Sequence, residues 1–589
     1  MWRAGKLILL IMVSSIIITP CGQTSEYYFD SEAGSDENPG TSEVKPFRSL
    51  EKLAQMPLKP GDIIRFRRGS VWRAQLNFQG NGVKGEPIHI TTYGEGPKPE
   101  FLASVRPMRW IHHDDQVYSI AIPEGWLVGD PEVNGAFHYP PDGVPVRLRK
   151  SKQIPSDKGR YYYDSENRNL YVITWDGKSP MENPIEISVI TPLLDLADRS
   201  WIQIEDLAFL FGGRNHWRLR NCKNIIIRDC AALFVGDKNP AVVISNGSEH
   251  IEIIGCFVYN SVNNGIKMTS GATRCQVRNC TVVKGLSNDG ITCHNGLPNN
   301  RTGDHNVIEN NVIGLWPENS VDITSGDYHV VRGNFCYNDR QSNIVIGHGA
   351  DHILVQNNIC VGSRRRGIQI GGNDEEGSRG RNMIYQNLTI NAAYPGVEVD
   401  RNNTKVYNNT VVNSRDRPGI RISAKAKGSD LRNNLVVVLD PEIPHPCIQV
   451  TKGDPSMYDL KFSHNMFFHM GRPDGRVLHT KDGYFTPGDF LTRYGTGEDS
   501  SIPEPIFADA FPRYYFLTKD SPCVDAGTDA SLTFTGKAPD VGWKDLGMEN
   551  EAPAIPEFLI RGEDDTDAIL YLWGKTDRKS AIDTSGVNW

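Results

Sequence analysis

The chain has 589 residues, with 63 basic and 71 acidic side chains and a formal net charge of −8. This near balance argues against general binding to nucleic acid or to an anionic membrane, because both require an excess of basic residues. The length exceeds one minimal domain, but a solenoid grows by adding coils rather than domains. The 56 glycines and many asparagines indicate a chain rich in turns and strands.

The N-terminus is typical of an export signal. A short basic region precedes the apolar run from Leu7 to Ile18, which is too short to span a bilayer comfortably. Cys21 lies where bacterial lipoproteins carry their lipid, although the preceding residue there is usually small. We expect a signal peptide over residues 1–22 and a secreted, periplasmic or outer-membrane-anchored bacterial protein. Simple secretion and a lipid anchor on Cys21 both remain open.

The segment from 23 to 110 predicts an N-terminal cap and the first coils. It contains a strand, a glycine- and proline-rich turn cluster and a helix start near Ser49. This helix should cover the open end of the stack, since a terminal repeat needs a polar outer cover. Residues 111–194 interrupt the pattern with the hairpin-like GRYYYDSENRNLYVITWDG, which predicts a β-rich insertion.

Regular coils are expected over residues 195–470. Short apolar strands recur there at intervals of 22 to 31 residues and close with Cys230, Cys256, Cys280, Asn311, Asn334, Asn358, Asn387, Asn409, Asn434 and Asn465. A second motif, apolar–x–apolar, recurs in the same phase. Two short strands per repeat fit a coil that returns above itself, so that the strands of neighbouring coils lie about 4.8 Å apart. The sequence therefore predicts an all-β fold, a right-handed parallel β-helix solenoid.

The residues that close these strands should stack in a column. Buried asparagines in such a column can hydrogen-bond from amide to amide along the axis. We interpret Cys230, Cys256 and Cys280 as core residues of the same column rather than as disulfides. No cysteines form CxxC pairs, so structural zinc is not expected. Residues 471–589 predict a C-terminal cap and a partly helical tail.

The outward side chains of the second motif should form one face. Because the apolar residues of each strand point inward, the residue between them and the residue two positions later point outward. The first outward column consists of Lys267, Thr292, Asp322, Val345, Gln369, Glu398 and Arg421. The second consists of Thr269, His294, Thr324, Gly347, Gly371, Asp400 and Ser423, with His348 next to Gly347.

The two glycines of the second column predict a trough at the middle of the stack. Arginines accumulate in the turns that flank this face, at positions 340, 364, 365, 366, 401, 415 and 417. The face is either an ordinary hydrophilic sheet with compensating charges or a groove. In a groove, the arginines would hold carboxylate or sulfate groups of a sugar chain with bidentate geometry.

Several segments carry a family resemblance. The stretches EYYFDSEAGSDENPGTSEVKPFRSL, GDIIRFRRGSVWR and YYYD…LYVITWDG, with the Asn-ended coils, resemble secreted bacterial right-handed β-helix proteins that act on polysaccharides. The resemblance covers nearly the whole mature chain. It implies an enzyme of a group that includes polysaccharide lyases, glycoside hydrolases and some epimerases, with the active groove on the outer face of one sheet.

The polygalacturonase branch of these proteins is not assigned. SNDGI, NSVDITSG, GHG and RRRGIQI lie near the places of its motifs. However, Asn319 and Ser320 replace its paired aspartates, and GHG follows its strand here instead of preceding it.

We favour β-elimination on an acidic, uronate-containing and in some cases sulfated carbohydrate, including loss of water from a terminal uronic acid. Elimination needs a cation at the carboxylate, a base and an acid. The candidate catalytic residues are Lys267, His294, Asp322, His348 and Arg366. The candidate substrate-binding residues are Asp289, Arg364, Arg365, Gln369, Glu398, Asp400, Arg401 and Arg421.

Two alternatives remain. Glycoside hydrolysis needs two carboxyl groups at about 5 to 9.5 Å, which Asp289 and Asp322, one coil apart, would supply. The other alternative is a non-catalytic carbohydrate-binding solenoid or adhesin, which would need neither of these carboxyl groups. We expect a monomer without a cofactor or metal, although Asn373–Asp374–Glu375–Glu376 is a candidate calcium site with a solvated loop as its alternative.

Overall fold

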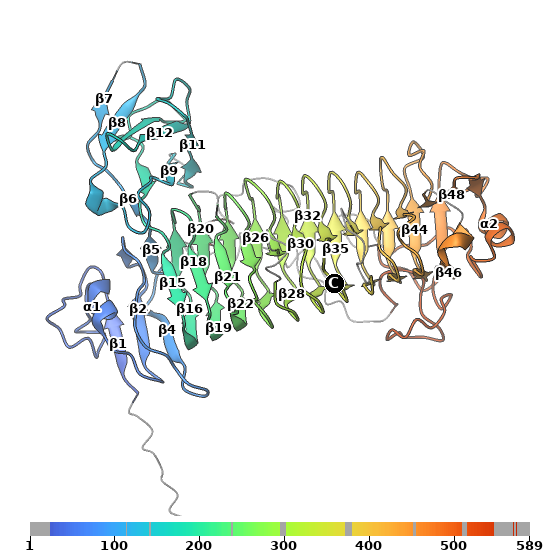
Figure 1. Ribbon diagram of the computed structural model, residues 1–589, viewed down its shortest axis with the longest axis horizontal. Helices are drawn as coiled ribbons and strands as arrows, with labels where there is room; N and C mark the ends of the chain where they lie inside the picture. The colour runs from blue at the N-terminus through green and yellow to red at the C-terminus, as the bar shows by residue number, and fades with distance from the viewer. Residues whose placement is uncertain are drawn as a thin grey trace, which may run out of the picture.

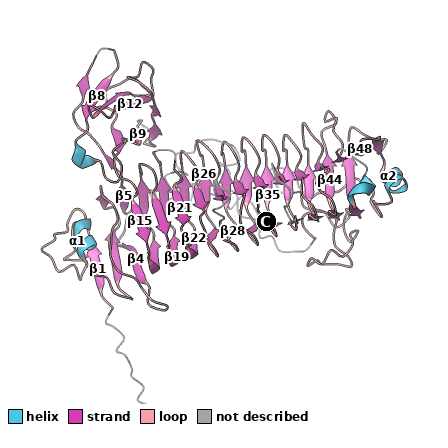
Figure 2. Ribbon diagram, viewed as in Figure 1, coloured by secondary structure: helices cyan, strands magenta, loops and turns pink. Residues whose placement is uncertain are grey.

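The computed structural model describes residues 24–113, 115–140, 143–236, 239–294, 302–371, 380–451, 455–508 and 515–546, with Ile569 and Trp573. These residues form an elongated right-handed parallel β-helix, as predicted, with coils stacked along one axis (Figure 1). Strands make up nearly all of its regular structure, and helices are few and short (Figure 2). The predicted signal peptide and calcium site, and most of the C-terminal tail, lie outside the described residues.

Three long sheets form the sides of the solenoid. The first contains 14 strands, which all pair in parallel. In sheet order they are β1 (Glu26–Phe29), β2 (Ile63–Arg67), β4 (Ile88–Tyr93), β16 (Ser200–Glu205), β19 (Lys223–Arg228), β22 (Glu249–Ile254), β25 (Gln276–Arg278), β28 (Val307–Glu309), β31 (Val330–Arg332), β34 (Leu354–Gln356), β37 (Met383–Tyr385), β40 (Lys405–Tyr407), β43 (Asp430–Arg432) and β46 (Lys461–Ser463).

The second sheet has 13 strands, of which the last two pair antiparallel. They are β15 (Leu194–Ala197), β18 (Trp217–Arg220), β21 (Val242–Ser245), β24 (Ile266–Met268), β27 (Ile291–Cys293), β30 (Val321–Ile323), β33 (Ile344–Ile346), β36 (Ile368–Ile370), β39 (Val397–Val399), β42 (Ile420–Ile422), β45 (Ile448–Val450), β48 (Leu478–Thr480) and β49 (Gly483–Phe485).

The third sheet also has 13 strands. They are β3 (Val71–Trp72), β5 (Glu100–Leu102), β17 (Ala208–Leu210), β20 (Ala231–Leu233), β23 (Phe257–Tyr259), β26 (Thr281–Val283), β29 (Val312–Gly314), β32 (Phe335–Tyr337), β35 (Ile359–Val361), β38 (Leu388–Ile390), β41 (Thr410–Val412), β44 (Leu435–Val438) and β47 (Met466–His469).

A separate lobe stands beside the first coils (Figure 1). It contains a four-stranded sheet of β10 (Val146–Arg147), β9 (Gly135–His138), β14 (Ile185–Ser188) and β6 (Ser104–Val105). A five-stranded sheet contains β11 (Arg149–Lys150), β12 (Arg160–Asp164), β13 (Asn169–Ile173), β8 (Tyr118–Ala121) and β7 (Ile111–His112). The predicted hairpin is the antiparallel pair β12–β13, with Tyr162 opposite Tyr171.

The helices are short. Helix α1 (Leu50–Gln55) begins after Ser49, whose side chain accepts a hydrogen bond from Lys52 N, and it lies at the N-terminal end of the stack as expected (Figure 1). Helix α2 (Pro487–Tyr494) lies at the other end. The 3₁₀ turns are η1 (Glu124–Trp126) and η2 (Pro455–Tyr458). Among the helices that the structure describes, none combines the length and apolar character that a membrane span requires.

The predicted column of strand-closing residues is present. From Asn311 to Asn465, each Nδ2 donates to Oδ1 of the next asparagine in the column at 2.8 to 3.0 Å. Cys230, Cys256 and Cys280 are buried and carry no disulfide. The ladder fixes the register of successive coils, since every amide in it is fully buried and depends on its neighbours for partners.

The outer faces of the first and third sheets carry different kinds of side chain. Side chains on the first sheet pair across coils, as in Glu252–Arg278 at 2.6 Å and Glu309–Arg332 at 2.5 Å. The third sheet has a largely apolar, buried outer face, and the returning C-terminal chain contacts this side. Trp543 N donates to Thr410 Oγ1 at 3.0 Å, and Trp573 packs against Phe234 with ring centroids 5.7 Å apart.

Candidate functional site

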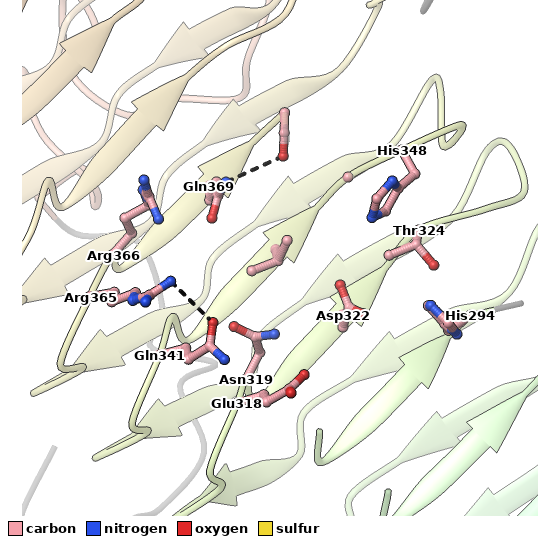
Figure 3. A pocket seen from close by; sticks show the side chains of 13 residues that line it. His294, Glu318, Asn319, Asp322, Thr324, Gln341, His348, Arg365, Arg366 and Gln369 are labelled. Atoms are coloured by element: carbon pink, nitrogen blue, oxygen red, sulfur yellow. Dashed lines mark hydrogen bonds between the residues drawn. The ribbon is translucent and has the colours of Figure 1, made fainter. Parts of the chain in front are cut away.

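A hollow of about 470 Å³ lies on the outer face of the second sheet, over strands β27, β30, β33 and β36 (Figure 3). We call it the central hollow. Its lining residues are His294, Glu318, Asn319, Asp322, Thr324, Gln341, Val345, Gly347, His348, Arg365, Arg366, Gln369 and Gly371. Six of these residues were candidates from the sequence: His294, Asp322, His348, Arg365, Arg366 and Gln369.

The strand pairing gives the first outward column the register that the repeat predicts. Consecutive partners across the sheet are Lys267, Thr292, Asp322, Val345, Gln369, Glu398 and Arg421. The second column follows the same ladder, because Thr324 N donates to Cys293 O and Gly347 N donates to Ile323 O. Residues about two dozen positions apart in sequence therefore lie directly beside each other.

Two glycines of the second column keep the hollow open. Gly371 has a φ of +121°, and a Cβ at this position would lie 2.3 Å from the Cβ of Asp400. At Gly347 an added Cβ would make only ordinary contacts, so its missing side chain simply leaves space. The predicted trough thus depends on backbone conformation at Gly371 and on side-chain size at Gly347.

One edge of the hollow is cationic. Arg365 and Arg366 precede β36 and lie together in Figure 3. Arg365 Nη1 donates to Gln341 Oε1 at 3.4 Å, and the guanidinium forms no ion pair with any described residue. Arg366 pairs with Glu398 at 2.6 Å, and Arg421 reaches the other oxygen of the same carboxylate at 2.9 Å. Glu398 is thus buried beneath two guanidinium groups.

The floor of the hollow contains a carboxyl group that favours its protonated form. Burial raises the pKa of Asp322 well above its ordinary value, and the negative charges of Asp289 and Glu318 raise it further. Asp289 lies one coil before Asn319, next to the hollow, and burial raises its pKa to about 7. Its Oδ1 accepts from Asn319 N at 3.1 Å and from Asn319 Nδ2 at 2.9 Å, so Asp289 orients a lining residue without lining the hollow itself.

The opposite edge carries imidazoles. His294 follows β27 and His348 follows β33, so both lie beyond the carboxyl ends of their strands (Figure 3). Burial lowers the pKa of His294 to about 4, and the charges of Lys267 and His348 act in the same direction. His294 is therefore neutral at neutral pH. Thr324 stands between the two rings, and its buried Oγ1 has no hydrogen-bond partner among the described residues.

The central hollow thus combines three chemical functions along the strand direction. Guanidinium groups occupy the amino edge, Asp322 with its raised pKa lies at the centre, and the imidazole of His294 with its lowered pKa lies at the carboxyl edge (Figure 3). These are the electrostatic, acidic and basic groups that general acid–base catalysis on an anionic substrate requires.

Other candidates lie outside the central hollow. Lys267 is two strands away from Asp322, and burial lowers its pKa. Arg364 is exposed and does not line the hollow. Asp289 lies in the coil before Asn319, while Glu398, Asp400 and Arg421 belong to the next coils along the axis in the other direction.

The structure differs from the prediction at Arg401. We expected this side chain to hold substrate in a turn that flanks the face, but the residue is only 1% exposed. Its guanidinium turns back into the protein and donates to the carbonyl oxygens of His348 and Ala350. Arg401 therefore supports the backbone around His348 and does not face the hollow.

The sequence reasoning missed Glu318 and Gln341. Both belong to a column in the turns, four residues before the strand centres, where Gln341 N donates to Glu318 O at 3.0 Å and Arg365 N to Gln341 O at 2.9 Å. The repeat period applied to these turns would have aligned all three residues. Among the described residues, no group of His, Cys, Asp or Glu side chains has the arrangement of a metal site.

Comparisons with known proteins agree with the fold. A family model described as a right-handed beta helix region matches residues 299–436. The comparison with curated proteins gives no significant match. The chain is similar to a solved structure of XylC with xylose, at 12% identity over 82% of this chain and 88% of that chain, with a TM-score of 0.45.

Two further similar structures are lyases. Pectate lyase Pel9A has 12% identity, coverage of 89% of this chain and 96% of that chain, and a TM-score of 0.40. The PL6 family alginate lyase AlyGC has 12% identity, coverage of 80% and 56%, and a TM-score of 0.41. Identities and TM-scores this low assign no reaction to this chain, so the chemistry must be argued from the site itself.

Proposed function

We propose that the protein is a carbohydrate-active enzyme that cleaves an acidic, uronate-containing carbohydrate by β-elimination in the central hollow. One observation carries this proposal: a cationic edge, a buried carboxyl group whose pKa is raised and an imidazole whose pKa is lowered line the same hollow. An export signal in residues 1–22 would place the enzyme outside the cytoplasm, where such polymers occur.

The cationic edge binds a uronate carboxylate of the carbohydrate chain. Arg365 has no ion pair with a described residue, and its planar guanidinium matches a carboxylate in bidentate geometry. Arg366 stands beside it and is oriented by Glu398. These cations precede β36, three coils or about 14 Å from β27 and His294, so they hold the carboxylate of a neighbouring unit while the reacting unit lies between Asp322 and His294.

The other two groups move protons. The neutral imidazole of His294 accepts the proton from the carbon next to the carboxylate. The electron pair of that C–H bond forms the C4–C5 double bond, and the bond from C4 to its oxygen breaks. The protonated Asp322 donates its proton to the leaving oxygen, so charge and atoms balance. Proton exchange with water restores both side chains.

Hydrolysis is the second candidate, and one observation favours it. Glu318 and Asp322 both line the hollow and offer a carboxyl pair. This pair differs from the predicted Asp289–Asp322 pair, because Asp289 does not line the hollow. A protonated Asp322 could serve as the acid, with Glu318 as base or nucleophile.

A product assay separates these reactions. The purified protein is incubated with polygalacturonate, alginate and a sulfated uronate polymer. Elimination produces a conjugated double bond with ultraviolet absorbance, whereas hydrolysis produces reducing ends without that absorbance. Binding without either signal would identify a non-catalytic carbohydrate-binding solenoid and overturn the enzymatic proposal.

Arg365→Ala tests the substrate class, with Arg364→Ala as the matched control, because both residues are exposed arginines in the same turn. Loss of one charge-assisted hydrogen bond should weaken substrate binding about tenfold or more in Arg365→Ala only. Equal binding by both variants would contradict the acidic-substrate assignment.

A further inference from the structure

The turn column that bounds the central hollow continues beyond it. After Glu318, Gln341 and Arg365 the next member is Tyr394, whose backbone N donates to Arg365 O at 2.8 Å. The ladder goes on in the following coil, where Asp416 N donates to Ala393 O at 2.7 Å and so places Arg417 beside Tyr394. One wall of side chains therefore runs along the axis out of the hollow, toward the C-terminal coils.

Beyond the hollow this wall is cationic. The guanidinium of Arg366 lies 5.9 Å from the centre of the Tyr394 ring, and that of Arg417 lies 5.2 Å from it. The aromatic ring thus separates two cations and restricts both through cation–π contact. Arg417 is exposed and hydrogen-bonds only to the carbonyl of Asp416, with no ion pair to any described residue.

The charges in this region do not cancel. Of the arginines at positions 365, 366, 417 and 421, only Arg366 and Arg421 pair with the carboxylate of Glu398. Arg365 and Arg417 form no ion pair with a described residue, although Asp416 directly precedes Arg417 in the chain. They lie two coils apart in one column, which corresponds to about 10 Å at the spacing of neighbouring strands.

We propose that Arg417 forms a second anion-binding subsite that takes the carboxylate or sulfate of another acidic unit on the same carbohydrate chain. This inference rests on the proposed function of the central hollow and deepens it: the preferred substrate is an acidic oligomer or polymer, with its chain directed from the hollow toward the C-terminal coils. A cationic wall continuous with the hollow complements a chain that repeats its negative charge.

The test compares Arg417→Ala with Arg415→Ala, since Arg415 is an exposed arginine in the same turn without a contact to Tyr394 among the described residues. Binding of galacturonate and alginate oligomers of two and of four to six units is measured by calorimetry. Arg417→Ala should weaken binding of the longer oligomers about tenfold and of the dimers much less. Arg417→Lys should recover part of the affinity, and added salt should reduce the difference.

The outcomes distinguish this inference from the proposed function. If the native protein neither binds nor cleaves any acidic oligomer, the proposed function fails. A second outcome is that the native protein binds these oligomers and Arg365→Ala weakens the binding, but Arg417→Ala binds oligomers of every length as tightly as Arg415→Ala. The second subsite would then be wrong, and the proposed function of the central hollow would be retained. An equal loss for dimers and longer oligomers would also refute the second subsite, because Arg417 would then belong to the central hollow.

Discussion

Asp322→Asn should abolish most of the activity while leaving the fold intact. The side chain is buried in the floor of the central hollow, and burial favours its uncharged form. Asparagine has nearly the same shape and is also uncharged, so the substitution removes little except the transferable proton. General acid catalysis typically contributes about 10²- to 10⁴-fold, which corresponds to about 3 to 5 kcal/mol of transition-state stabilisation.

The same variant should be more stable than the native protein near neutral pH, although it is less active. A carboxyl group whose pKa is raised on folding destabilises the folded state as the pH rises above its unfolded pKa, because the unfolded chain then releases the proton first. Removing that group from position 322 should therefore leave the melting temperature unchanged at acidic pH and raise it toward neutral pH. Active sites often retain such a stability cost for the sake of function.

The assay measures kcat with the best acidic substrate and the melting temperature across the same pH range. Asp474→Asn, an exposed aspartate near Arg476, is the control for loss of one carboxylate. Full kcat in Asp322→Asn would refute the assignment of this residue as the acid. A reduced kcat accompanied by a lower melting temperature would refute the argument that the loss is chemical.

Three further predictions concern the scaffold. The pKa of Asp289 is about 7 in the folded chain against an ordinary value of 3.8, so the free energy of unfolding should fall as the pH rises from about 4 to 7, by at most about 4 kcal/mol at 1.36 kcal/mol per unit. Denaturant unfolding across this pH range should show the decline in the native chain and not in Asp289→Asn. A difference between the two proteins that does not change with pH would contradict this prediction. Asn358→Ala should lower the free energy of unfolding by about 3 kcal/mol, because Asn334 N and Val331 O lose buried hydrogen bonds of 3.0 and 2.9 Å. An unchanged urea midpoint would show that the asparagine ladder contributes little to stability. Gly371→Ala should weaken substrate binding and lower the melting temperature, because the new Cβ would lie 2.3 Å from the Cβ of Asp400 and the backbone has a φ of +121°. In the same thermal scan Gly347→Ala should lower the melting temperature less, because its Cβ would make only ordinary contacts.

The architecture and the alignment of side chains on the outer face follow from the repeat in the sequence. In a solenoid, one repeat period sets both the coil and the register, so the partners of Asp322 in its column followed from spacing alone. The same logic predicted the asparagine ladder, because a buried amide requires a partner and the next coil supplies one. Within strands, the two-residue alternation also determines direction, which is why Gln369 points outward as expected.

The direction of the side chains in the turns and the pKa values of the buried groups follow from the folded structure and not from the repeat. The alternation of strands does not extend into turns, so Arg401 folds inward while Arg365 faces the hollow, although both are turn arginines. Glu318 and Gln341 line the hollow for the same reason, without a strand motif to indicate them. The perturbed pKa values of Asp322, Asp289 and His294 depend on depth and on charges from neighbouring coils, and desolvation is a property of the packed molecule rather than of the local sequence.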